Sequence, residues 1–206
     1  MKRKNNRRGI MGCSNIPYAQ RLKMQQESDI VNCRNHSAKI AMYIISIALH
    51  DVVGAGYRSL VRFARHHKTL VEEFYQDQEV GMAHCVKWME ELGMPISGEF
   101  FIAPPDGSTV RELEVKTNAL QAMQIAMILG AISANVIYGL GAKRQRRLSN
   151  RIREIYTRYN QEGQGFLLAE MAKLGFEVTP DGRVLYVENS ETGEVMPVKL
   201  VRGVTQ

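Results

Sequence analysis

The chain has few cysteines, and this scarcity excludes one class of protein. Only Cys13, Cys33 and Cys85 occur among the 206 residues, and an odd number at uneven spacing does not suit the disulfide framework of a small secreted domain. Residues 9–14 are too short and too weakly apolar for the core of a secretion signal. We therefore expect a protein that stays in the reducing cytoplasm.

The sequence also lacks the common motifs of enzymes. It has no Walker loop and no nucleophile elbow, and Gly54-Ala55-Gly56 lacks the third glycine and the preceding strand of a dinucleotide fingerprint. His50 and Asp51 are adjacent, but adjacent residues on a helix point in different directions. We expect no catalytic residues and no cofactor.

Two stretches of the sequence resemble each other at an offset of 85 residues. Ile40-Ala41-Met42 recurs as Ile125-Ala126-Met127, and Gly54-Ala55-Gly56 recurs as Gly139-Leu140-Gly141. A fixed offset of this kind predicts an internal duplication. All six prolines, at positions 17, 95, 104, 105, 180 and 197, lie outside the predicted helices of both copies, as helices require.

Each copy reads as three helices followed by a hairpin. An apolar segment, Ala38–Val53 or Leu120–Tyr138, ends at the Gly-x-Gly. A second helix and a third, closed by Gly93 or Gly175, follow at helical spacing. The β-branched runs in residues 94–115 and 176–201 surround Asp-Gly turns, which are hairpin signals. The apolar positions of the second helices are Phe63, Leu70 and Phe74, and Leu148, Ile152, Ile155 and Tyr159.

The predicted fold class is therefore mainly α with small β-hairpins (α+β), built from two tandem pseudo-repeats. We expect a basic, partly disordered N-terminal tail at residues 1–30. The first helical repeat with its hairpin would cover residues 31–118, and the second, with its C-terminal hairpin, residues 119–206.

The net charge of +6 is unevenly distributed. Residues 1–23 hold seven basic residues and no acidic one, and residues 142–158 hold seven basic residues against Glu154. The remainder has 13 basic and 20 acidic residues. Clustered cations of this kind are typical of a surface that binds a polyanion, although a solvated tail and one charged helix face would give the same pattern.

The Gly-x-Gly turns are the most suggestive candidate site. A hydrophobic-Gly-hydrophobic-Gly turn between helices resembles the helix-hairpin-helix element of DNA-binding proteins, and the resemblance implies that backbone N–H groups contact a phosphate. Cations follow each turn, and they are denser in the second copy. The predicted nucleic-acid-binding residues are Lys2, Arg3, Lys4, Arg7, Arg8, Gly54, Gly56, Arg58, Arg62, Gly139, Gly141, Lys143, Arg144, Arg146, Arg147 and Arg151.

Metal binding and membrane insertion are the alternatives. Cys33 and His36 have the spacing of half a zinc site, and His66-His67 or His84-Cys85 could complete it. The second copy has hydrophobic residues at the positions that match His67, His84 and Cys85, so we expect no metal. Residues 125–141 are uncharged but shorter than the roughly 20 residues of a membrane span. We expect a buried helix there and no membrane contact.

The stretch Ile47–Phe63 is similar to a recurring segment of small, uncharacterised proteins of phages and prophages of Gram-positive bacteria. In that segment a helix ends in Gly-aromatic-Gly and the next carries Arg-Leu-x-Arg-Phe. This chain differs by having Ala55 or Leu140 at the aromatic position, and Leu148 where the first copy has Phe63. The resemblance implies a bacterial cytoplasmic setting and no particular activity.

Two functions follow from these features. The first is a non-enzymatic, phage-type accessory protein that binds the phosphate backbone of nucleic acid, with duplex favoured because few aromatic residues are placed for base stacking. The second is a protein-interaction module, such as a phage inhibitor or adaptor that docks on a nucleoprotein complex or an acidic protein. The oligomeric state does not follow from the sequence.

Overall fold

The computed structural model describes residues 17–76 and 109–179, together with residues 87, 90, 91, 184, 185, 187, 188, 195 and 196. Five helices dominate these residues: α1 (Tyr18–Val53), α2 (Tyr57–Gln76), α4 (Val110–Tyr138), α5 (Ala142–Glu162) and α6 (Gln164–Lys173). Four strands of two residues each, β1 (Glu177–Val178), β2 (Val184–Leu185), β3 (Val187–Glu188) and β4 (Val195–Met196), form the antiparallel pairs β1–β2 and β3–β4.

The predicted α+β class is wrong, because the described part of the chain is almost entirely helical. Residues 110–115, expected in the first hairpin, form the start of α4. Thr109 explains this difference: its side chain accepts a hydrogen bond from the Glu112 N–H, which caps the helix and outweighs the strand preference of Val110 and Val115. The rest of that predicted hairpin lies outside the described residues, and the two-residue pairings near the C-terminus are too short to form a sheet layer.

The helix α1 begins at Tyr18 rather than at Ala38, inside the segment predicted as a tail. Its first half, residues 18–36, has neither glycine nor proline, and residues 19–27 consist entirely of Ala, Gln, Arg, Leu, Lys, Met and Glu. These residues favour a helix without producing an apolar stripe, because their side chains lose little freedom in a helix and need not be buried. Most of this half of α1 is exposed or partly exposed.

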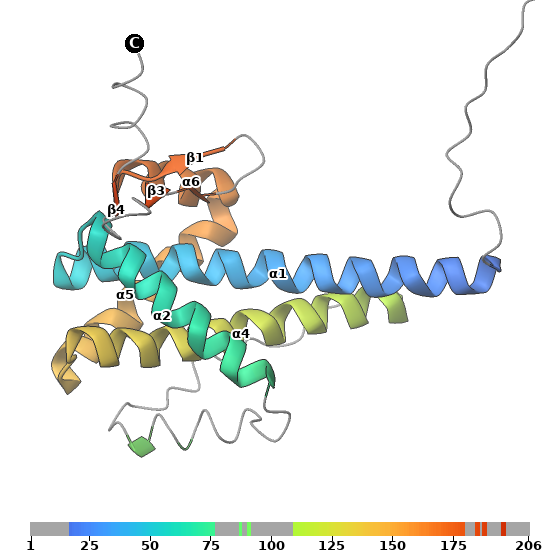
Figure 1. The fold of residues 1–206 in the computed structure, drawn as a ribbon, viewed down its shortest axis with the longest axis horizontal. Helices are drawn as coiled ribbons and strands as arrows, with labels where there is room; N and C mark the ends of the chain where they lie inside the picture. Colours follow the sequence, from blue (N-terminus) through green and yellow to red (C-terminus); the bar gives the residue numbers. More distant parts are fainter. Residues whose placement is uncertain are drawn as a thin grey trace, which may run out of the picture.

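The helices α1 and α4 run side by side in the same direction and form the centre of the molecule (Figure 1). Near the start of α4, Arg111 Nη2 lies 2.7 Å from Asp29 Oδ2, and Gln26 Nε2 donates to Glu114 Oε2 at 2.9 Å. Further along, Ile45 contacts Gly130. Residues early in α1 contact residues early in α4, and residues later in α1 contact residues later in α4. The two helices are therefore parallel and nearly in register at an offset of about 85 residues.

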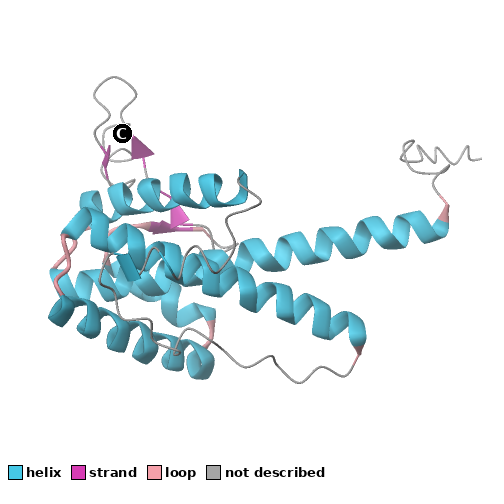
Figure 2. Ribbon diagram, turned by 90° about the horizontal axis from the view of Figure 1, so that it is seen from below, coloured by secondary structure: helices cyan, strands magenta, loops and turns pink. Residues whose placement is uncertain are grey.

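The helices α2 and α5 cross this central pair, and each packs chiefly against the long helix that it does not directly follow in the sequence. The helix α2 follows α1 in sequence but packs chiefly against α4, whereas α5 follows α4 and packs chiefly against α1 (Figure 1). Each connection therefore delivers its second helix to the other long helix. The view at right angles shows the two connecting turns at the same end of the helices (Figure 2).

Burial explains the apolar composition of α4. It is the one helix in the described ranges that is long and apolar enough to cross a membrane by length and composition, and 61% of its most apolar window is buried. Its buried residues are Ala122, Met123 and a continuous stretch from Ala126 to Ala134, and the helix contacts α1 and α2. Packing inside the protein therefore accounts for the uncharged segment, as the sequence predicted.

Candidate nucleic-acid interface

The two Gly-x-Gly turns have the conformation that the sequence predicts. Gly54 ends α1 with φ 70°, and Gly139 ends α4 with φ 56°, both in the left-handed region that glycine adopts without a steric penalty. The middle residues, Ala55 and Leu140, are buried. Each turn therefore anchors its middle side chain in the core and exposes its two glycines.

The turns lie close together at the end of the parallel pair. Ser59, in the first turn of α2, donates from Oγ to the Tyr138 hydroxyl at 2.9 Å, and Tyr138 is the last residue of α4. The Tyr138 hydroxyl in turn donates to the Ser59 carbonyl at 3.2 Å. Burial raises the pKa of Tyr138, so the phenol remains neutral and able to donate. We call this part of the molecule, formed by residues 50–65 and 135–150, the turn end.

Several amides of the turns are not available to a ligand. The Gly54 N–H donates to the His50 carbonyl at 2.9 Å, and the Gly139 N–H donates to the Asn135 carbonyl at 2.8 Å. The Ala55 N–H also bonds within the turn, to the Leu49 carbonyl at 3.4 Å. The helix-hairpin-helix resemblance implies that such amides contact a phosphate, and these three bonds argue against that use of Gly54 and Gly139.

A side chain holds the middle carbonyl of each turn. His50 donates from Nδ1 to the Ala55 carbonyl at 3.1 Å; because that oxygen can only accept, this nitrogen carries the proton. In the second turn Gln145 donates from Nε2 to the Leu140 carbonyl at 2.8 Å and to Asn135 Oδ1 at 3.1 Å. His50 therefore helps to fix the first turn, and Gln145 has the same role in the second turn.

Cations follow both turns on exposed surface. Arg58 and Arg62 are exposed on the first two turns of α2, and the first two turns of α5 expose four cations, Lys143, Arg144, Arg146 and Arg147. None of these four α5 side chains pairs with an acidic residue within the described ranges. Neither helix has an acidic residue in its first turn, and α5 has no side-chain cap. Cations at a helix N-terminus oppose the helix dipole, so a bound anion would relieve an unfavourable charge arrangement.

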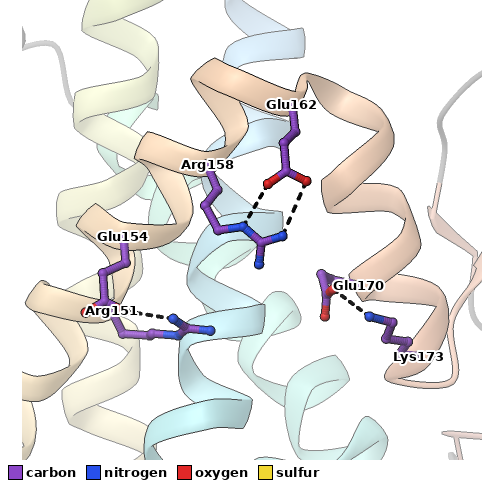
Figure 3. A network of polar contacts seen from close by, with 6 residues as sticks. All are labelled: Arg151, Glu154, Arg158, Glu162, Glu170 and Lys173. Carbon is purple, nitrogen blue, oxygen red and sulfur yellow. Dashed lines mark hydrogen bonds and ion pairs between the residues drawn. The ribbon is translucent and has the colours of Figure 1, made fainter.

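The second half of α5 differs, because Arg151 and Arg158 form ion pairs with carboxylates of the same chain (Figure 3). Arg158 contacts both carboxylate oxygens of Glu162, at 2.9 and 3.3 Å, and its guanidinium lies 4.1 Å from the centre of the Phe166 ring. On the neighbouring helix, Lys173 Nζ lies 2.7 Å from Glu170. The basic run predicted at residues 142–158 therefore divides into an open first part and an internally paired second part.

Arg151 belongs to the paired part, although the sequence placed it among the binding residues. It contacts Asp51 Oδ2 at 2.8 Å and Glu154 Oε2 at 2.7 Å, and these hydrogen bonds raise its pKa. Asp51 lies on α1, so the contact joins α5 to the helix that it packs against. Asp51 is also the single acidic residue in the sequence of the turn end.

One further acidic residue lies close to the first turn. The ring of Phe176 packs on Tyr57 with 4.7 Å between ring centres, which brings the start of β1 beside the start of α2. Glu177 is the first residue of that strand. The first two turns of α2 also expose two cations against four on α5, so the α2 side of the turn end is less basic than the α5 side.

The structure brings together two of the three groups of predicted binding residues. The glycines and cations of the two turns share one end of the molecule, with Arg151 diverted into ion pairs. Lys2, Arg3, Lys4, Arg7 and Arg8 lie outside the described residues. The sequence did not predict the role of Gln145, because nothing in a single sequence shows that this residue of a basic run is buried. It also did not predict the Ser59–Tyr138 contact, which joins α2 to α4.

The histidines and cysteines do not assemble a metal site in the described ranges, where no group of three or more His, Cys, Asp or Glu residues could hold a metal ion. His84 and Cys85 lie outside those ranges. His67 is buried and bonds through Nε2 to the Ala126 carbonyl at 3.0 Å. Its burial lowers the pKa to about 4, so the ring is neutral near pH 7.

The comparisons with known proteins do not assign this interface. No protein-family model matches the chain, and neither a curated protein nor a solved structure matches it.

Proposed function

We propose that the protein binds nucleic acid through the phosphate backbone, with the turn end as the contact surface and without enzymatic activity. One observation carries this proposal: Lys143, Arg144, Arg146 and Arg147 are exposed without an acidic partner in the described ranges, while Arg151 and Arg158 of the same helix are paired. Exposed cations without internal counterions can neutralise phosphates, and this releases the cations condensed on the nucleic-acid backbone.

The placement of the cluster supports the same function. It lies at the start of α5, where the positive end of the helix dipole adds to the field of the side chains. Arg62 of α2 also lies near this region, since it acts electrostatically on Tyr138. Contacts of this type fix a protein on a backbone without reading bases, so we expect weak sequence selectivity.

We also propose that the two helical hairpins, α1 with α2 and α4 with α5, are copies of one unit. At the 85-residue offset, Gln26 corresponds to Arg111 and Glu114 corresponds to Asp29. Gln26 contacts Glu114, and the corresponding residues Arg111 and Asp29 also contact each other. Ile45 and Gly130, which differ by 85, touch each other. Contacts that exchange in this way are expected when two copies are related by a twofold axis, as in a homodimer.

The test is fluorescence anisotropy of labelled nucleic acid at increasing salt. We expect binding at low salt and a steep loss of affinity as salt rises. The triple variant replaces Arg144, Arg146 and Arg147 with alanine. It should reduce the magnitude of the negative slope of log K against log salt by about 2 to 3, because each lost phosphate contact removes about 0.9.

The matched control removes three exposed cations that lie outside both basic segments, with Lys39→Ala, Lys68→Ala and Lys116→Ala. It changes the net charge equally but leaves the turn end intact, so its salt slope should stay close to that of the wild type. Equal losses in both triple variants would show that only net charge matters, and the absence of binding at low salt would reject the function.

The protein-interaction alternative is supported by one observation at the other end of the molecule. Tyr18 is 74% exposed and Val110 is 86% exposed, near the starts of α1 and α4, with Leu22 and Leu113 also exposed. These apolar side chains all lie near the N-terminal ends of the two long helices, and exposed apolar surface there would suit a protein partner. A pull-down from nuclease-treated bacterial lysate, comparing the wild type with Leu22→Ser plus Leu113→Ser, tests it: a partner lost in this variant would favour the adaptor function.

A cytoplasmic location in a bacterial host, and an origin in a phage or prophage, remain part of the proposal. They rest on the sequence resemblance of residues 47–63, and on the burial of α4, which leaves no need for a membrane to cover that helix.

A further inference from the structure

The twofold relation between the hairpins defines a direction in the molecule. Ile45 and Gly130 lie at equivalent positions and touch, so an approximate twofold axis passes between them. The contacts Gln26–Glu114 and Asp29–Arg111 exchange about the same axis. Because α1 and α4 are parallel, this axis runs along them and leaves the molecule at the turn end (Figure 1).

The cations of the turn end are arranged about this axis. Arg58 and Arg62 of α2 are equivalent to Lys143 and Arg147 of α5 at the 85-residue offset. The helix α2 starts from the end of α1 and crosses α4 on one side, and α5 starts from the end of α4 and crosses α1 on the other side (Figures 1 and 2). Two equivalent basic helix starts therefore stand on opposite sides of the axis.

The separation of the two helix starts is small. Packed helices such as α1 and α4 have axes about 8–10 Å apart, so their C-terminal turns are separated by a distance of that order. The Ser59–Tyr138 hydrogen bond agrees with this, since it joins the start of α2 directly to the end of α4. One ligand can therefore contact both starts at once.

A duplex has the symmetry that this surface requires. Its two antiparallel backbones are related by twofold axes perpendicular to its length, and proteins with twofold symmetry bind duplexes with the two sets of axes aligned. A single strand has no such axis, and its binding sites use aromatic platforms for bases. The two tyrosines of the turn end are already engaged: the Tyr57 ring packs on Phe176, and the Tyr138 hydroxyl bonds to Ser59.

We propose that the ligand is a nucleic-acid duplex lying across the turn end, with one backbone on the α2 cations and the other on the α5 cations. This inference rests on the proposed function and on the proposed relation between the hairpins. It adds how the duplex lies on the protein, because it assigns the α2 and α5 cations to different strands.

The test compares a labelled duplex of about 20 base pairs, roughly two helical turns, with a single strand of the same length. We expect the full-length protein to bind the duplex about tenfold more tightly at moderate salt, because two backbones are engaged rather than one. Arg62→Ala and Arg147→Ala should each weaken duplex binding about three- to tenfold, and their effects should multiply in the double variant.

Lys68→Ala is the matched control on α2, because Lys68 is exposed further along that helix and lies 3.7 Å from Glu72. Its duplex affinity should equal that of the wild type. Equal affinity for duplex and single strand would overturn the duplex inference while leaving backbone binding in place. A loss with Arg147→Ala but none with Arg62→Ala would show one-sided contact and also overturn it, whereas no binding to either probe would reject the proposed function itself.

Discussion

The Cδ1 methyl of Ile45 occupies the space that a side chain at Gly130 would need. The two residues are 85 positions apart and touch where α1 packs against α4. A large residue on α1 and a glycine on α4 fit together, whereas two large residues at this point would overlap. The absence of a side chain at Gly130 therefore lets Ile45 pack against the backbone of α4.

This contact predicts coupling between the two positions. Gly130→Ala should gain up to about 1 kcal/mol of helix propensity but meet the Ile45 methyl, and crowding of a packed core costs about 1–3 kcal/mol. Ile45→Val removes that methyl and costs about 1 kcal/mol alone. The free energy of unfolding is measured by urea denaturation. We expect the double variant, Ile45→Val plus Gly130→Ala, to be more stable by about 1 kcal/mol or more than the sum of the two single changes predicts.

The neighbouring position provides the control for this cycle. Ala131 is buried close to Gly130 but packs in the second core cluster, with Leu70 and Ile128. Ala131→Gly with Ile45→Val should therefore show additive losses. Additivity in the Ile45–Gly130 cycle as well would contradict the contact.

Some of this arrangement follows from the sequence and some cannot. The ends of α1 and α4 were predictable, because Gly54 and Gly139 combine glycine's tolerance of positive φ with the end of an apolar run. The apolar spacing of Leu148, Ile152 and Ile155 likewise identified the buried face of α5. The exchange of α2 and α5 between the long helices was not predictable, because it depends on packing between residues far apart in the chain.

The candidate site shows the same division. The sequence located the cations after each turn, since charge clusters are visible directly. It did not separate Arg151 from Arg147, because the difference lies in Asp51, which is 100 residues away along the chain. It also missed the early start of α1, whose residues 18–36 have helical preference but no apolar periodicity.

His67 predicts how stability depends on pH. Its pKa is about 4 in the folded protein against 6.5 ordinarily, because the ring is buried against α4, where residues 117–142 contain no charged residue, and because His66 is adjacent. The unfolded chain therefore binds the proton more readily. Stability contributed by the neutral ring is present above about pH 6.5 and is lost as pH falls toward 4, with a total of about 3 kcal/mol.

Urea unfolding at several pH values between 4 and 7 measures this loss. His67→Gln retains an N–H donor for the Ala126 carbonyl and removes the titration, so most of the pH dependence should disappear. His50→Gln is the control, since His50 is exposed, and should keep the wild-type slope. An unchanged slope in His67→Gln would show that another group is responsible.

Asp51 predicts a gain of affinity rather than a loss. Asp51→Asn would remove the single acidic residue from the sequence of the turn end and release Arg151 from one of its two carboxylates. Affinity for a polyanion at low salt should rise about two- to fivefold, and the gain should shrink as salt increases. Because the Asp51–Arg151 pair is about one-third exposed, its loss should cost less than about 1 kcal/mol of stability.

The comparison for this variant is Glu162→Gln, which removes one acidic residue near the far end of α5 and releases Arg158. Its net charge equals that of Asp51→Asn, but the released arginine lies away from the turn end. Anisotropy titrations should show the larger gain for Asp51→Asn. The same gain in both variants would mean that the surface is not localised.

Gly139 separates stability from binding at the second turn. A side chain at Gly139 would meet no atom within 4 Å, so the cost of Gly139→Ala comes from the left-handed φ of 56°, about 1–2 kcal/mol. Since the Gly139 N–H is bonded to Asn135, the folded variant should bind nucleic acid like the wild type. Gly165→Ala, in the first turn of α6 and also without a close atom, should instead raise stability by up to about 1 kcal/mol. Thermal unfolding measures the stability, and anisotropy measures the binding. If Gly139→Ala is fully folded but binds clearly more weakly, the backbone of this turn contacts the phosphate after all.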